Sequence, residues 1–314
     1  MNRQDLLLQS IRKKIGDRSL HDVLSEILAI SYDAAHRRIS GKSKLTLEEA
    51  LTLSQYFSIP LDQLHSKSGL LHCKKSVSVT SQTELASYIQ QAVSDLQAFQ
   101  PQGTFYYSAK DIPLFYTLGG NLLTKFKWYV WLNLLAKPEE SKAFHQFYLT
   151  ASVAEQAQHL QQIYAKATVH ELWNDSTLNS TLFQIDYYYE SGLLQANEAL
   201  LLLADLLQLV QDIERKLNEE STYFLYYHEL LLMNNNVLVE NERLRKLFVP
   251  YTMISYLVTE DEQTLIEAKT YFQRLLQNAK CLNTAGPKDR LQFFAKKKQR
   301  IQFYHQKIKE SIQE

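Results

Sequence analysis

The chain has 314 residues, of which 45% are hydrophobic and 22% are charged, and these ordinary values for folded globular proteins exclude wholesale disorder. Eight glycines and six prolines are few for this length, so the composition disfavours turn-rich all-β folds and favours helices. The two cysteines, Cys73 and Cys281, lack CxxC spacing, which argues against a zinc site or a disulfide framework and suits a reducing cytoplasm. No secretion signal and no membrane-spanning apolar run is visible, so we expect a cytoplasmic protein without membrane contact.

The net charge of zero conceals an asymmetry along the chain. Residues 1–75 contain 12 Lys and Arg against 8 Asp and Glu, whereas the remainder contains 22 against 26. A basic N-terminal part suits a polyanionic partner, although an excess of this size also arises by chance.

Five short helices are predicted in a first domain, residues 1–66. Apolar residues recur there at helical spacing, between stop and start signals such as Gly16, Ser31 and Gly41. The predicted helices are 6–15, 19–29, 31–41, 46–57 and 60–64. Thr46 and Glu49 have the spacing of a capping box. The fourth helix is expected to bury Leu47, Ala50, Leu51, Leu53, Ser54 and Phe57.

Residues 19–41 have the order of a helix-turn-helix: a capped amphipathic helix, a tight Ala-Ile-Ser turn, and a short helix with a polar, basic outer face. A helix of this kind fits the DNA major groove, where side chains near its N-terminus reach base edges. Residues 5–65 resemble the lambda-repressor-like (Cro-repressor-like) helix-turn-helix family. The resemblance is carried by Leu24–Ser31, Ala35–Gly41, Leu45–Leu51 and Phe57–Leu64.

The resemblance implies which residues contact DNA. Tyr32, Asp33, His36 and Arg37 take the positions that face bases, Lys42 and Lys44 those where the following loop touches phosphate, and Ser31 begins the recognition helix. The chain departs from many members by carrying Leu20 and His21 where a phosphate-binding Gln is frequent, and Ala29 where the turn often has Gly.

Residues 67–83 are interpreted as a linker, and residues 84–314 as a larger dimerisation or regulatory domain. Its predicted helices are 84–98, 122–136, 139–166, 195–219, 261–280 and 287–312. Strand character is assigned to 104–108, 181–187, 223–233, 237–239 and 251–258, with a hairpin around Asn234–Asn236. We therefore expect a mainly α protein, whose second domain is α-rich (α+β) with a small sheet.

The second domain carries no recognisable catalytic pattern. GxGxxG, GxxxxGK[ST], GxSxG and HExxH are absent, and the pairs His170-Glu171 and His228-Glu229 are isolated. We therefore expect no enzyme activity, no cofactor and no metal site. Its dense aromatic residues indicate either a packed core or a small-ligand pocket with Lys110, Asp111 and Glu190 as polar anchors. The last helix, which contains Lys296–Lys298, either packs on its own domain or contacts DNA or a second copy.

Taken together, these features predict a sequence-specific transcription regulator that binds double-stranded DNA as a homodimer and responds to a small-molecule or protein effector. A dimer is expected because one small domain offers few base contacts. The alternative is a protein–protein interaction module whose helix-turn-helix does not bind DNA. An enzyme with a helix-turn-helix appendage ranks last.

Overall fold

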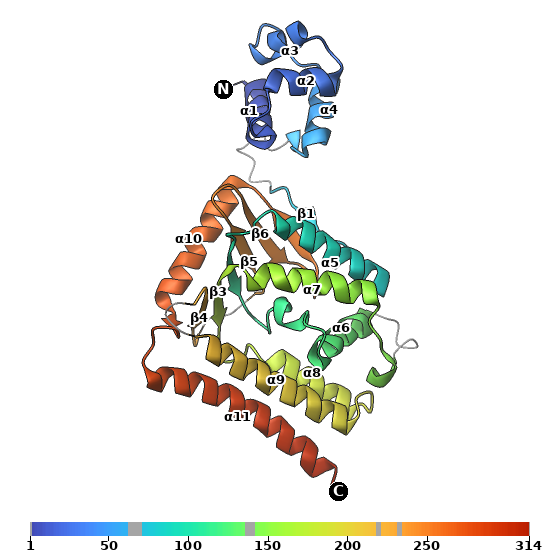
Figure 1. The fold of residues 1–314 in the computed structure, drawn as a ribbon, viewed down its shortest axis with the longest axis vertical. Helices are drawn as coiled ribbons and strands as arrows, with labels where there is room; N and C mark the ends of the chain where they lie inside the picture. Colours follow the sequence, from blue (N-terminus) through green and yellow to red (C-terminus); the bar gives the residue numbers. More distant parts are fainter. Residues whose placement is uncertain (1, 62–70, 136–141, 218–220, 231–233, 314) are drawn as a thin grey trace. The chain divides into compact units, whose positions relative to one another are not determined.

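The computed structural model describes residues 2–61, 71–135, 142–217, 221–230 and 234–313 (Figure 1). The chain divides into two compact units, residues 1–72 and 73–314. Within the described residues, no helix has both the length and the apolar character needed to cross a membrane.

The first unit is helical, as predicted. Its helices, blue in Figure 1, are α1 (Arg3–Ile15), α2 (Leu20–Leu28), α3 (Tyr32–Ile39) and α4 (Leu47–Phe57). The Thr46–Glu49 capping box at the start of α4 is present, with hydrogen bonds of 3.1 and 2.8 Å. The helices enclose a core of Leu7, Leu8, Ile11, Leu20, Leu24, Ala35, Leu53 and Ile59. Most of the predicted fifth helix, 60–64, lies outside the described residues.

The buried side of α4 is narrower than predicted. Leu53 is fully buried, and Ala50 and Phe57 pack against the core, but Leu47 is 73% and Leu51 is 42% exposed. Consecutive helical residues are about 100° apart around the axis, so the face defined by Ala50, Leu53 and Phe57 turns Leu51 outward. The prediction that Leu47 and Leu51 are buried is therefore wrong.

The second unit combines seven long helices with a sheet, within the described residues. The helices are α5 (Gln82–Gln97), α6 (Leu122–Leu135), α7 (Ala151–Ala165), α8 (Asn179–Glu190), α9 (Ala196–Lys216), α10 (Glu262–Asn278) and α11 (Pro287–Ser311). Two 3-10 helices, η2 (Leu114–Thr117) and η4 (Phe144–Gln146), precede α6 and α7. The helix predicted at 139–166 is shorter than expected, because α7 begins only at Ala151.

The sheet is larger than predicted. Eight strands are present in the described residues, in the order β1-β7-β6-β5-β2-β3-β4-β8. They are β1 (Lys74–Lys75), β2 (Thr104–Ser108), β3 (Thr168–Trp173), β4 (Tyr223–Tyr227), β5 (Val237–Glu240), β6 (Arg245–Pro250), β7 (Tyr256–Thr259) and β8 (Lys280–Cys281). Strands β2, β3 and β4 run parallel, and the other pairs are antiparallel. The prediction of a mainly α protein with a small sheet is therefore wrong.

Two strand assignments also fail. Residues 181–187 belong to α8, where Leu182, Ile185 and Tyr188 are buried at helical spacing. The predicted hairpin around Asn234–Asn236 is wrong because β4 pairs with β3 and β8, whereas β5 pairs with β2 and β6. The hairpin that does form joins β5 to β6, and the Asn241 side chain accepts hydrogen bonds from two backbone amides in its turn.

The two faces of the sheet are covered unequally. On one face, the main core packs residues of the parallel strands, such as Phe105 and Tyr107, against the helices of the second unit other than α10. On the other face, Leu238 and Leu247 pack against Leu265 and Phe272 of α10, which lies apart from the other helices in Figure 1. Because successive residues of a strand alternate between faces, β2 contributes to both cores.

Candidate nucleic-acid interface

The turn between α2 and α3 is tight. Ala29 adopts the left-handed conformation, with φ 50° and ψ 40°, and the Ile30 amide donates a 3.2 Å hydrogen bond to the Ser25 carbonyl. Two residues later, the Ser31 hydroxyl accepts a hydrogen bond from the Ala34 amide and caps α3. This local geometry sets the direction of the short third helix.

The predicted contact residues lie on α3, at its N-cap Ser31, and in the following loop with Lys42 and Lys44. Ala35 is fully buried and anchors α3, whereas every predicted contact residue is exposed. These residues are Ser31, Tyr32, Asp33, His36, Arg37, Lys42 and Lys44. An α-helix with its side chains is about 10–12 Å in diameter, which matches the width of a major groove. Their contact with DNA stays a prediction.

His21, at the start of α2, holds two of these side chains in a stack. Its ring lies 5.2 Å from that of Tyr32 and 5.4 Å from that of His36, with nearly parallel planes. The His21 Nε2 and His36 Nδ1 atoms are 3.3 Å apart, so one ring donates a hydrogen bond and the other accepts it. The sequence gives no sign of this stack, because it joins residues from two helices.

The loop after α3 is held by Gln4 of α1. The Gln4 amide nitrogen donates hydrogen bonds to the carbonyls of Arg38 and Ser43, at 2.7 and 3.1 Å. Its oxygen accepts a 2.9 Å hydrogen bond from the Leu45 amide. These three bonds shape the segment that carries Lys42, and sequence reasoning did not find them.

An ion pair links α3 to α4 beneath this loop. The Arg38 guanidinium donates two hydrogen bonds to the Glu49 carboxylate, at 3.2 and 2.9 Å, and a third to the Ser43 hydroxyl. The hydrogen bond with Arg38 lowers the pKa of Glu49 and raises that of Arg38. Arg38 is therefore engaged within the unit, whereas Arg37 next to it faces outward.

Two of the three candidate ligand anchors of the second unit lie together, and Glu190 lies apart from them. Lys110 and Asp111 line a cavity of about 290 Å³. Asp111 forms a 2.8 Å ion pair with the buried Lys127. Glu190 instead pairs with Lys307 of α11, at 2.6 Å, and does not line this cavity. The aromatic residues mostly build the core, although Tyr88, Tyr107, Trp131 and Tyr256 also line the cavity.

Glu171 lies at the centre of the main core rather than at a surface. Its carboxyl group accepts hydrogen bonds from Tyr164, Trp173 and Tyr223, at 2.6, 2.8 and 2.9 Å. Burial raises the pKa of Glu171, and these donors oppose that rise. The neighbouring His170 faces the other side of the sheet, between Tyr106 and Phe224, where burial lowers its pKa to about 4.

Comparison with the curated proteins and with the solved structures gave no match for this chain. A family model described as the BetR domain matches residues 3–96, which contain the four helices of the first unit and α5 of the second except its last residue. This part of the chain is thus similar to the BetR domain, a regulator domain of the helix-turn-helix type.

Proposed function

We propose that the protein is a sequence-specific DNA-binding transcription regulator. The observation that carries the proposal is the match of residues 3–96 to a regulator-type domain, together with a capped, outward-facing α3. In this proposal Arg37 donates to guanine, Asp33 accepts from cytosine, and Lys42 and Lys44 contact phosphates.

The second unit, in this proposal, joins two copies and responds to an effector inside the cytoplasm. Two copies supply the base contacts that a single α3 lacks, with half-sites about one helical turn apart. The cavity beside Asp111 supports an effector role, because it combines aromatic walls with polar side chains. The absence of a recognised catalytic pattern leads us to propose a regulator rather than an enzyme.

The test is selection of bound sequences from random duplex DNA by the full-length protein and by Arg37→Ala. Arg12→Ala serves as the matched control, because Arg12 is an exposed arginine on α1, away from α3. Enrichment of a palindrome by the wild type and the control, lost or relaxed in Arg37→Ala, is the expected result. Absence of enrichment at low salt by the wild type would contradict the proposal.

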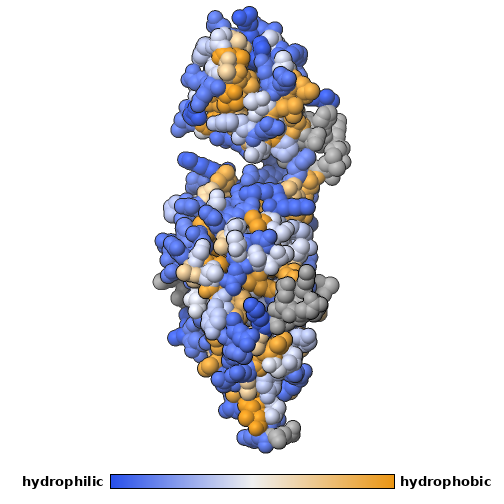
Figure 2. Space-filling model, turned by 90° about the vertical axis from the view of Figure 1, so that its right-hand side faces the viewer, coloured by the Kyte–Doolittle hydropathy of each residue, from blue (hydrophilic) through white to orange (hydrophobic). Residues whose placement is uncertain are grey.

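A protein-interaction module is the second candidate, and one observation favours it. Leu47, Leu51 and Tyr56 of α4 are exposed by 73%, 42% and 61%, and apolar residues reach the surface of the first unit (Figure 2). Exposed apolar side chains that lie together on a small domain are typical of a surface that binds another protein. The salt dependence of binding separates the two candidates. Affinity for DNA falls steeply as the salt concentration rises, whereas affinity for a protein partner held by apolar contacts does not.

A further inference from the structure

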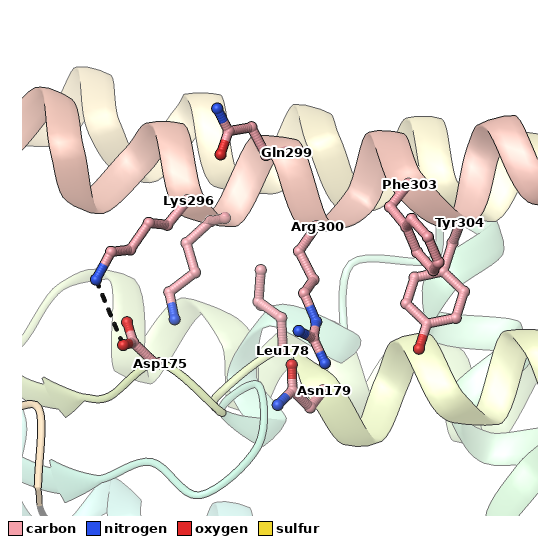
Figure 3. A pocket seen from close by; sticks show the side chains of 9 residues that line it. Asp175, Leu178, Asn179, Lys296, Gln299, Arg300, Phe303 and Tyr304 are labelled. Carbon is pink, nitrogen blue, oxygen red and sulfur yellow. Dashed lines mark ion pairs between the residues drawn. The ribbon is translucent and has the colours of Figure 1, made fainter.

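A basic hollow lies between α11 and the segment that connects β3 to α8. It has a volume of about 650 Å³. Lys296 and Arg300 point from α11 toward this segment, whereas Gln299 points away from it (Figure 3). The other lining residues are Asp175, Leu178, Asn179, Lys297, Phe303 and Tyr304.

Positive charge in the basic hollow exceeds negative charge. Lys296, Lys297 and Arg300 line it, with Asp175 as the single carboxylate among the lining residues. Lys296 is 3.5 Å from Asp175 in an exposed ion pair, and the buried Lys297 ammonium donates to the Asn174 carbonyl. The Arg300 guanidinium has no ion pair or hydrogen bond within the described residues.

Two other cations of α11, Lys298 and Lys307, are neutralised by carboxylates of neighbouring helices. Lys298 pairs with Glu214 at 2.5 Å, and Lys307 pairs with Asp186 at 2.7 Å. Arg300 lies between these two positions and lacks such a partner. An anion from outside the chain would supply the missing negative charge.

The pKa of Lys297 responds to its surroundings. Burial is the main cause that lowers this pKa to about 8; Asp175 opposes the shift, and Lys296 and Arg300 add to it. An anion in the basic hollow would favour the charged ammonium and raise this pKa.

The position of the basic hollow in the fold also suits an anion. The segment follows the carboxyl end of β3, a central parallel strand, and ligands of α/β sheets bind at this edge. Asn179, the first residue of the 12-residue helix α8, lines the basic hollow, and its side-chain amide can donate a hydrogen bond to an anion. Phe303, which is 64% exposed, and Tyr304 add an aromatic wall beside Arg300 (Figure 3).

We propose that the basic hollow binds a small phosphorylated molecule of nucleotide size. Its phosphate lies between Arg300, Lys296 and the Asn179 side chain, and its organic part lies against Phe303 and Tyr304. A planar guanidinium forms bidentate hydrogen bonds with phosphate, which makes Arg300 the main determinant. This inference does not depend on DNA binding by α3.

The experiment is isothermal titration calorimetry of the full-length protein at low ionic strength, with inorganic pyrophosphate and with AMP as probes. The variants are Arg300→Gln and Lys296→Gln. Lys309→Gln is the matched control, because Lys309 is another exposed cation of α11 that does not line the basic hollow. We expect Arg300→Gln to weaken binding about tenfold or more, since a charge-assisted hydrogen bond is lost, and Lys309→Gln to bind as the wild type does.

Tighter binding of AMP than of pyrophosphate would support the aromatic wall as the place of the organic part. Two results would overturn the proposal. One is no saturable binding of either probe by the wild type. The other is equal weakening in Arg300→Gln and Lys309→Gln, which would reveal unspecific attraction to charge. A third result would also refute the proposal: the wild type binds neither probe, and Arg300→Gln binds random duplex DNA more weakly than the wild type does. The basic hollow would then be a contact site for nucleic acid and not for a small molecule.

Discussion

The hydrogen bonds of Gln4 predict a specific weakness of the first unit. Gln4→Ala removes all three bonds between α1 and the loop of residues 38–45. Each contributes about 0.5–1.5 kcal/mol net, and Gln4 is half-buried, so the free energy of unfolding falls by about 2 kcal/mol. For a unit of this size, such a loss lowers the melting temperature by about 10 °C.

Hydrogen exchange measured by mass spectrometry locates this effect. The peptide that contains Leu45 is expected to exchange faster in Gln4→Ala, because the Leu45 amide loses its acceptor. Gln4→Glu keeps an acceptor for the Leu45 amide but is also expected to lower the melting temperature, since a carboxylate faces the carbonyls of Arg38 and Ser43 without a proton to donate. Gln55→Ala is the control, because Gln55 is an exposed helical glutamine. Unchanged exchange around Leu45, with a melting temperature within about 2 °C of the wild type, would refute the reasoning.

Three further predictions concern the first unit. Ala29→Gly is expected to raise the free energy of unfolding by about 1 kcal/mol in a urea titration, because Ala29 has a positive φ that glycine adopts without strain; no gain would contradict this. Lys42→Ala is expected to reduce the slope of log affinity for DNA against log salt by about 0.9, and an unchanged slope would exclude its phosphate contact. Since Arg38 lowers the pKa of Glu49 below its usual 4.5, the pair stabilises the fold above pH 4.5 and this contribution is lost as the pH falls through the lowered pKa. In Glu49→Gln, the free energy of unfolding, measured in unfolding curves at a series of pH values, is expected to fall less below pH 4.5 than in the wild type. An equal fall in both proteins would show that other groups cause it.

The helices of the first unit could be predicted because their signals are local. The Ser31 cap and the Thr46–Glu49 box act within one helical turn, and the outward face of α3 follows from helical spacing alone. Gln4 could not be found in this way, because its partners are backbone carbonyls and an amide about 40 residues away.

Strands were expected where β2, β4, β5 and β7 form, but the size and strand order of the sheet were not predicted, because they depend on residues that are distant in sequence. Strand β3 carries a glutamate into the core, and Glu171 is tolerated there only because Tyr164 and Tyr223 reach it from other elements. The basic run of α11 was visible in the sequence, but only the packing of α11 against the rest of the second unit brings Arg300 close to Asn179. Propensity and spacing carry no information about such contacts.

The sheet ends on both sides in strands of only two residues, β1 and β8. Lys74 and Lys75 form one of these edges, and Lys280 lies in the other. Short, lysine-bearing edges offer few backbone groups to a further strand and discourage edge-to-edge association. Two copies of the chain are therefore expected to meet through helices or through the α10 face, without extending the sheet from one copy into the next.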